Sequence, residues 1–224
     1  MSLLLKTISI IAPAKCVVCG REGQELCQSC APDLLNRLPG RCFRCQKLNL
    51  GSKTCSTCHR QAPLKYVWVA GEYEDGLKRA IKAFKFERQR GLARSLAEIM
   101  KDLVPETIKP PIIVHVPTAT TRRRIRGYDH AERLASEVAK QTGWRHVPAL
   151  RRQTQTRQVG ARRLTRIAQL EGAFRVIRTE YARGREILLI DDVITTGATI
   201  TACAKELKKA GAKSVSAVVL AQKS

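Results

Sequence analysis

The C-terminal part of the chain carries the pattern of two strands joined by one helix. Residues 187–190 (ILLI) and 214–221 (SVSAVVLA) are apolar runs, and residues 199–210 between them have helical spacing. A strand, helix and strand in this order lie parallel, with a right-handed crossover. Parallel strands are apolar on both sides and need helices on both faces. The sequence therefore predicts an α/β domain built on a mainly parallel sheet.

Patterns between residues 63 and 170 fit the same architecture. The stretch 121–130 (TRRRIRGYDH) is too polar and basic to be core, and 151–170 reads as a long basic connection with some helical content. Strands are predicted within 65–74, 111–117 and 145–150, and helices over 78–86, 92–103 and 131–142, the last of them ending at Gly143.

The N-terminal part is dominated by cysteine pairs with two residues between the partners. A two-residue gap lets both sulfurs of a tight turn reach a tetrahedral ion about 2.3 Å away, and two such turns complete the ligand sphere. The pattern predicts two closed, structural Zn²⁺ sites. Consecutive pairing is the simpler arrangement, and a crossed one, first pair with third and second with fourth, stays open; a disulfide scaffold or an iron-sulfur centre would also use paired cysteines. The ligands are Cys16, Cys19, Cys27, Cys30, Cys42, Cys45, Cys55 and Cys58.

Two domains follow from this change in composition: residues 1–62, an N-terminal helix and a double zinc-ribbon module, and residues 63–224, the α/β domain. A segment as short as the first cannot stabilise a fold with its own core, so metal is needed. Metal-binding thiolates require a reducing compartment, which indicates the cytoplasm. His59 is expected beside the ligands without joining them, and Cys203 is expected in the core.

The opening residues, MSLLLKTISIIAPAK, have some likeness to a signal peptide. No basic residue precedes the apolar run, however, and Lys6, Thr7 and Ser9 interrupt it. A short amphipathic helix is the preferred interpretation. No run of about 18 apolar residues occurs, so no membrane span is expected.

Two adjacent acids, Asp191 and Asp192, follow the first strand of the C-terminal unit. Ligands of open parallel sheets bind beyond the carboxyl ends of the strands, which is where both acids lie. Residues 195–199 then offer hydroxyls and N–H groups at a helix N-terminus, and Gly197 permits close approach of an anion. Acceptors for sugar hydroxyls beside donors for a phosphate indicate a ribose 5-phosphate. In a purely structural interpretation, the acids cap a turn and Thr199 is an ordinary N-cap.

The chain is strongly basic. It holds 41 Lys and Arg against 19 Asp and Glu, a formal net charge of +22. Such an excess indicates a polyanionic partner, for which phosphate in a small ligand or a polymer is the natural candidate. Aromatic residues are only 4% of the chain, so base stacking on many rings is not available as a general binding mode.

The order of these motifs resembles one known family. The chain lacks both G-x-x-x-x-G-K-[ST] and G-x-G-x-x-G. Instead, an apolar run followed by DDV and TTGAT resembles the phosphoribosyl pyrophosphate signature of type I phosphoribosyltransferases. With CVVCG, FKFERQRGLARSLA, RRRIRGYDHAERLA and RQVGARRLTRIAQLEGAFRV, nearly the whole chain is similar to the ComF competence family. The resemblance implies a type I phosphoribosyltransferase-like parallel sheet flanked by helices, with a small N-terminal zinc-ribbon module.

In that resemblance, Asp191 and Asp192 hold the ribose hydroxyls and are the catalytic candidates. Residues 195–199 cradle the 5-phosphate, and residues 122–127 form a mobile basic loop over the pyrophosphate, which binds with Mg²⁺. The implied phosphoribosyl pyrophosphate site comprises Asp191, Asp192, Val193, Thr195, Thr196, Gly197, Ala198, Thr199, Arg122, Arg123, Arg124 and Arg126.

Two positions depart from the pattern of the family and its relatives. The family commonly has Gly-Phe-Asn-Gln where residues 127–130 read GYDH. Purine-salvage relatives place an Asp, their candidate general base, at the position of Thr195. Because a threonine cannot take a proton from a nucleobase near neutral pH, purine-salvage chemistry is disfavoured.

Two functions follow. In the first, a phosphoribosyltransferase, the arginines of residues 122–126 stabilise the departing pyrophosphate; a solvated basic surface or a nucleic-acid patch explains these arginines equally well. In the second, the protein is an accessory protein that binds single-stranded DNA, with a vestigial or sensory phosphoribosyl site. The ComF resemblance implies a role in DNA uptake, with single-stranded DNA and DNA-uptake proteins as partners. Both functions can coexist in one chain.

Overall fold

The computed structural model describes residues 13–35, 41–87, 89, 91–153, 170 and 172–223, with the backbone alone at Leu50, Arg122 and Arg126. The amphipathic helix expected at the N-terminus and most of the basic connection after residue 153 lie outside the described residues. Within them, no helix is both long enough and apolar enough to cross a bilayer.

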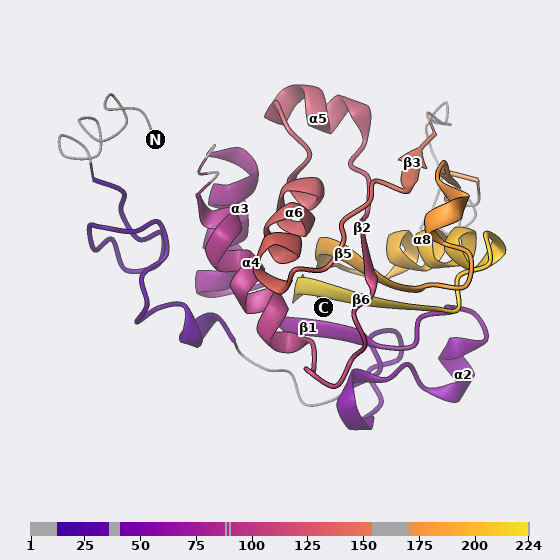
Figure 1. Cartoon of the computed structure of the whole chain (residues 1–224). Helices are drawn as coiled ribbons and strands as arrows, with labels where there is room; N and C mark the ends of the chain where they lie inside the picture. The colour runs from indigo at the N-terminus through magenta and orange to yellow at the C-terminus, as the bar shows by residue number, and fades with distance from the viewer. Residues whose placement is uncertain are drawn as a thin grey trace, which may run out of the picture.

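Four parallel strands form the central sheet, in the order β1-β6-β5-β2 (Figure 1). Their register places Val114 opposite Leu189, and Leu189 opposite Ala217. All three residues are buried, as expected for strands covered on both sides. The strands are β1 (Val67–Glu72), β2 (Ile112–His115), β5 (Glu186–Ile194) and β6 (Ser214–Gln222).

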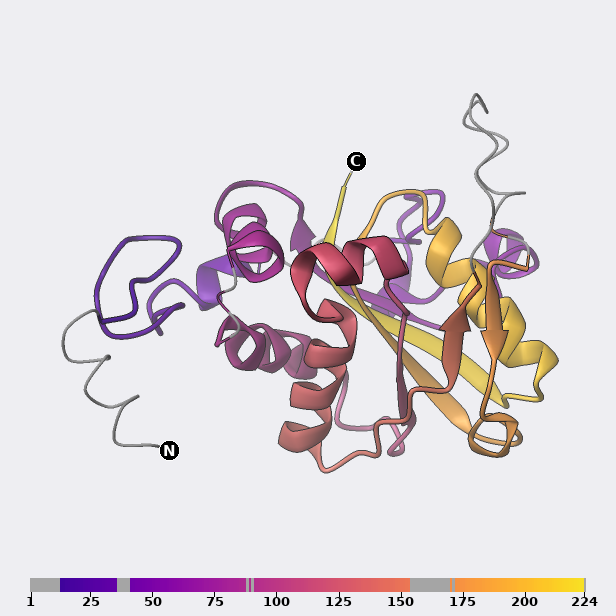
Figure 2. The ribbon, with the colours of Figure 1, turned by 90° about the horizontal axis from the view of Figure 1, so that it is seen from above.

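Helices cover both faces of the sheet, which confirms the predicted α/β class. Seen from above in Figure 2, α8 lies to one side of the strands, and α4 and α6 lie to the other. The first face carries α3 (Asp75–Phe86), α4 (Leu92–Leu103) and α6 (His130–Thr142). The second carries α8 (Ala198–Lys209) and an antiparallel hairpin of β3 (Leu150–Arg152) and β4 (Phe174–Val176).

The two cysteine-rich segments pack on opposite faces of the sheet. Leu26 and Leu34 of the first segment belong to the core under α3 and α4. Phe43 and Leu64, from the second segment and the residues after it, belong to the core under α8. Because both segments share a core with the sheet, the division after residue 62 stays a prediction. Short helices in these segments and near the hairpin are η1 (Pro32–Leu34), η2 (Leu50–Ser52), α2 (Ser56–His59) and η3 (Thr179–Tyr181).

Two helix predictions agree with the structure closely. Helix α4 spans the predicted residues, and α6 ends at Gly143, whose φ of 72° is left-handed. Helix α3 begins at Asp75, before the predicted start at residue 78. Helix α8 ends at Lys209, close to the predicted position.

The basic stretch after β2 is a correction to the sequence analysis. Thr120–Arg126 is helical and forms α5, not a loop. Arginine favours the helical state, and Gly127, with φ 78°, ends the helix by donating its N–H to the Arg123 carbonyl at 2.8 Å. The arginines of this stretch are therefore presented on a regular helix.

Two strand predictions also change. The run 145–150 forms only a bridge between His146 and Ile113, and the next strand begins at Leu150, because Pro148 has no N–H to extend the ladder. Strand β5 continues past residue 190 to Ile194, paired with the long β6. The acid pair therefore lies within the strand and not beyond it.

Candidate functional site

The sheet has a topological switch point between β2 and β5. Strands β2 and β5 are neighbours in the sheet. Helix α6, which comes after β2 and α5 in the chain, packs on one face, whereas α8, which follows β5, packs on the other. The loops after two such strands diverge and leave a crevice at their carboxyl ends, where open α/β sheets bind ligands. The acid pair lies near the carboxyl end of β5, and the loop 195–197 connects that end to α8.

The two acids occupy different environments at the end of β5. Asp192 is buried, with 4% of its surface exposed, whereas Asp191 is half-buried. Consecutive strand residues point to opposite faces of a sheet, and Asp192 faces α3 and α6. The Asp192 N–H donates to Asp191 Oδ1 at 2.9 Å, which fixes the Asp191 carboxylate against the backbone.

Asp192 is held by two side chains that the sequence analysis did not assign to the site. Lys85 Nζ of α3 lies 2.7 Å from Asp192 Oδ1, and both side chains are largely buried. His130 Nε2, from the first residue of α6, contacts Asp192 Oδ2. The departure from the family pattern at residues 127–130 was the available signal for His130, and the family-like motif FKFERQRGLARSLA, which contains Lys85, was the signal for Lys85.

A second group of polar contacts holds His130. Asp129 caps α6 by accepting the N–H groups of Ala131 and Glu132. It also accepts from Thr118, through the backbone N–H at 2.9 Å and through Oγ1 at 2.8 Å. Thr118 Oγ1 in turn lies 3.3 Å from His130 Nδ1. The buried residues 129–130 therefore tie the loop after β2 to the acid pair, although their polarity predicted an exposed position.

These surroundings separate the two acids in pKa. Burial opposes ionisation of Asp192, but the charges of Lys85 and His130 outweigh it and lower its pKa. Burial and the neighbouring charge of Asp192 raise the pKa of Asp191 to about 7. The repulsion between the adjacent acids is thus relieved by the protein itself, because Asp192 has two partners and Asp191 holds its proton up to near neutral pH.

The loop after β5 presents an open helix N-terminus. Gly197, with φ 69°, is the N-cap of α8 and has no side chain to cap it; at this end of the described helix, the Ala198 N–H alone donates to a nearby side chain, Thr196 Oγ1, at 3.4 Å. Thr199 is therefore not the N-cap, so the purely structural interpretation is wrong about this residue. Thr195 and Thr196 are exposed, and Ala198 and Thr199 are half-buried. Uncapped N–H groups and nearby hydroxyls are donors suited to a phosphate.

The cysteine sulfurs gather into two clusters by consecutive pairs, so the crossed arrangement is wrong. Cys19 and Cys27 Sγ are 3.7 Å apart, as are Cys45 and Cys55 Sγ. Tetrahedral Zn–S bonds of about 2.3 Å require sulfurs about 3.8 Å apart, so both clusters fit zinc. The first cluster is Cys16, Cys19, Cys27 and Cys30, and the second is Cys42, Cys45, Cys55 and Cys58.

His59 and Cys203 lie where the sequence predicted. His59 Nδ1 lies 3.0 Å from the Leu64 carbonyl, outside the second cluster. Cys203 is fully buried in the core. Burial raises the thiol pKa of Cys16 and Cys42, but backbone N–H groups outweigh it and lower both values to about 6, which favours the thiolate that a metal binds.

Comparison with known proteins identifies the fold. Residues 86–224 match the phosphoribosyl transferase domain family. The chain belongs to this family. It is 29% identical to Competence protein F of Haemophilus influenzae, an alignment covering 84% of this chain and 93% of that protein.

Two further relatives are similar to this chain over most of its length. DNA utilization protein YhgH of Escherichia coli strain K12 is 27% identical, covering 89% of this chain and 86% of the relative. Competence protein ComFC of Streptococcus pneumoniae is 24% identical, covering 90% and 96%. The resemblance to the ComF competence family is confirmed, and the two cysteine clusters fit its double zinc ribbon.

In this phosphoribosyl transferase domain, the described arginines of α5 border a groove. Arg123 and Arg124 are exposed. They line a groove of about 600 Å³ with Arg133, Asp129 and other residues of the α5–α6 region. Asp129 lines this groove and contacts Thr118, which contacts His130, so the groove is connected to Asp192 through a chain of polar contacts.

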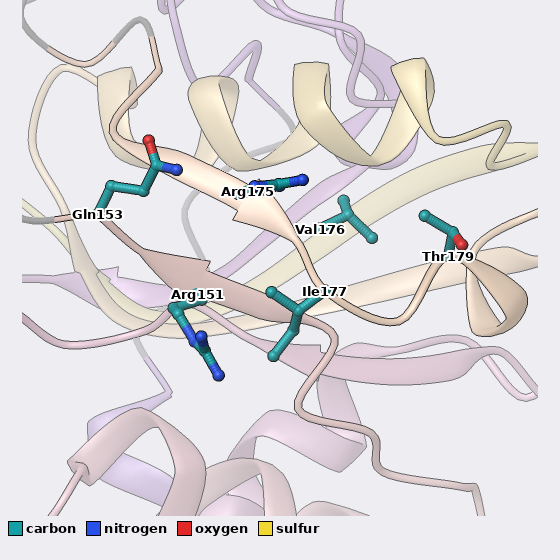
Figure 3. A pocket seen from close by; sticks show the side chains of 6 residues that line it. All are labelled: Arg151, Gln153, Arg175, Val176, Ile177 and Thr179. Atoms are coloured by element: carbon teal, nitrogen blue, oxygen red, sulfur yellow. The ribbon is translucent and has the colours of Figure 1, made fainter.

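A second basic pocket of the phosphoribosyl transferase domain lies at the β3–β4 hairpin. Arg151 and Arg175 are directly opposite each other in the antiparallel register. Both are exposed, and they line a pocket of about 330 Å³ together with Gln153, Val176, Ile177 and Thr179. Figure 3 shows their side chains diverging from the two strands. From the sequence, Arg151 was placed in the basic connection and Arg175 in a motif of the family resemblance, and neither was assigned to a site.

Proposed function

We propose that this protein binds phosphoribosyl pyrophosphate, or another ribose 5-phosphate ligand, at the crevice between β2 and β5. The observation that carries the proposal is the half-buried Asp191 at a topological switch point beside the uncapped N-terminus of α8. An acceptor for sugar hydroxyls and donors for a phosphate are thereby next to each other. Membership of the phosphoribosyl transferase domain family supports the same ligand class.

Different residues bind different parts of the ligand. Asp191 accepts hydrogen bonds from the ribose hydroxyls, and the N–H groups and hydroxyls of residues 195–199 hold the 5-phosphate. Asp192, fixed by Lys85 and His130, keeps the end of β5 in place. Mg²⁺, bound with the pyrophosphate, would neutralise the leaving charge. In a transfer reaction, the arginines of α5 would stabilise that charge and exclude water.

Ligand titration tests this proposal. Isothermal titration of the intact protein with phosphoribosyl pyrophosphate and Mg²⁺ should give saturable binding. Asp191→Ala combined with Asp192→Ala should abolish it, and Lys205→Ala, at an exposed position of α8, should leave it unchanged. Circular dichroism would verify that the double variant remains folded. Absence of binding to the parent protein would refute the proposal.

The affinity should depend on pH through Asp191. Its pKa is raised to about 7, and only the ionised carboxylate accepts hydrogen bonds with both oxygens. Below pH 7 the protein must release a proton to bind, so Kd should fall about tenfold between about pH 6 and 8. The Asp191→Asn variant should lack this component, while the titration of the ligand's own phosphates is common to both proteins. Identical pH profiles for the two proteins would contradict the assignment.

Single-stranded DNA binding is a second candidate function, favoured by the hairpin pocket. Arg151 and Arg175 are exposed and line the same pocket, and no described acid forms an ion pair with either. Their charges would be neutralised by phosphates of a bound strand. The relatives named as competence and DNA utilization proteins support a role in DNA uptake.

The salt dependence of DNA binding tests this second function. For single strands, each phosphate contact contributes about 0.7 to the slope of log K against log salt. Replacing Arg151 and Arg175 with serine should therefore lower the slope by about 1.4, measured by anisotropy of a labelled oligonucleotide. Serine at Arg79 and Arg94, exposed on α3 and α4, is the control. An equal loss in the control would show nonspecific charge attraction and contradict a hairpin site.

A further inference from the structure

Phe43 connects the second cysteine cluster to the loop that follows β5. It lies directly after Cys42, within the first pair of that cluster, and only 4% of its surface is exposed. Its ring packs against Gly197: a Cβ built on this glycine would lie 2.5 Å from Cε2 and 2.9 Å from Cδ2 of Phe43. The space that Gly197 leaves open by lacking a side chain is thus occupied by the Phe43 ring.

The backbone of Phe43 is anchored at the same edge of the sheet. Gln222, the last residue of β6, is buried and donates from Nε2 to the Phe43 carbonyl at 3.1 Å. Gln46 donates to the same carbonyl at 3.1 Å. The turn itself is closed by Gln46 N–H to the Cys42 carbonyl at 2.9 Å. The ring and the peptide of Phe43 therefore both have fixed positions relative to the loop.

The first cluster makes no comparable contact among the described residues. Its segment packs against α3 and α4: a Cβ on Gly76 would meet Leu34, and a Cβ on Gly91 would meet Glu25. These contacts are on the other face of the sheet. The two clusters have the same ligands and the same spacing within each pair, but they pack against different elements of the fold.

We propose that Phe43 is a positioning residue for the phosphate-binding loop, so that metal in the second cluster, and not in the first, sets the affinity for the ligand. The four thiolates of the second cluster fit Zn²⁺, and the metal would hold the turn that carries Phe43. Without this packing, Gly197 loses the contact that holds its backbone in the left-handed conformation. The N–H groups of the loop then no longer point together toward the phosphate. The affinity part of this inference rests on the proposed function.

A readout within the loop tests the positioning independently of any ligand. The Thr201 N–H donates to the Gly197 carbonyl at 2.9 Å, so its hydrogen exchange reports the place of Gly197. Phe43→Ala should speed exchange at Thr201 at least tenfold. The Gly143 N–H, bonded to Ala139 at 2.9 Å on the other face, should not change. Unchanged exchange at Thr201, or equal acceleration at both amides, would overturn the proposal.

The matched cluster variants are Cys45→Ser and Cys19→Ser, which replace the second, exposed thiol of the first pair in each cluster. Zinc content is measured for both. Cys45→Ser should speed exchange at Thr201 and raise Kd for phosphoribosyl pyrophosphate about tenfold; Cys19→Ser should do neither. Phe43→Leu keeps all eight ligands and an apolar contact, so it should lie between the parent and Phe43→Ala. If the parent binds no phosphoribosyl ligand, the proposed function fails while the exchange comparison still decides the role of Phe43. Equal effects of the two cysteine variants would overturn the asymmetry.

Discussion

Replacing Lys85 with methionine should lower the free energy of unfolding by about 3 kcal/mol, because it leaves the charge of Asp192 buried with one partner fewer. Lys85 Nζ lies 2.7 Å from Asp192 Oδ1, and the two side chains are 13% and 5% exposed. Solvent cannot replace the lost ammonium at such a site. Denaturant unfolding followed by circular dichroism measures the loss.

The exposed Lys82, on the same helix, provides the control for Lys85. Lys82→Met removes an equal charge and should change stability by less than about 0.5 kcal/mol. In an Asp192→Asn background, Lys85→Met should cost less by at least about 1 kcal/mol, because the buried charge is no longer present. Additive losses in this double-mutant cycle would show that Lys85 acts by packing and not by pairing with Asp192.

Alanine at Gly197 should destabilise the protein by about 3 kcal/mol, of which about 1 kcal/mol is backbone strain and the rest overpacking against Phe43. The residue has φ 69°, and its added Cβ would lie 2.5 Å from the Phe43 ring. The ring is buried, with 4% of its surface exposed, so a shift would disturb the residues packed around it.

Gly143 provides a matched control, since its φ is 72° and an added Cβ would meet nothing within 4 Å. Gly143→Ala should cost only the backbone strain, about 1 kcal/mol. Chemical denaturation of both variants separates strain from packing. Equal losses at the two glycines would mean that Phe43 moves aside freely, and that the contact with Gly197 has little energetic weight.

The sequence predicted the elements whose signals are local. The apolar runs of 187–190 and 214–221 became the two central strands, and α4 spans residues 92–103 as expected. The cysteine spacing predicted two four-sulfur clusters, since both sulfurs of a pair come from one turn. Errors arose where a neighbour in space decided the outcome: β5 extends to Ile194 because β6 is there to pair with it.

The candidate site was predicted in part. Asp191, Asp192 and the loop 195–199 lie at the carboxyl edge of the sheet, at a switch point, although the acids are inside the strand. Lys85 and His130 were missed because their contacts with Asp192 join segments that are far apart in the chain. Residues 122–127 were expected to form a mobile loop because the family resemblance implies one, whereas Thr120–Arg126 forms α5.

By itself, the sequence determined the parallel sheet, the two four-cysteine clusters and the position of the acid pair near the carboxyl edge of the sheet, because periodicity and spacing act over a few residues. The tertiary structure alone decided that Asp192 is neutralised by Lys85 and His130, and that Phe43 fills the space beside Gly197. These contacts join segments far apart in the chain. They form only when α3, α6 and the second cysteine cluster pack on the sheet, and no local pattern specifies where those surfaces meet.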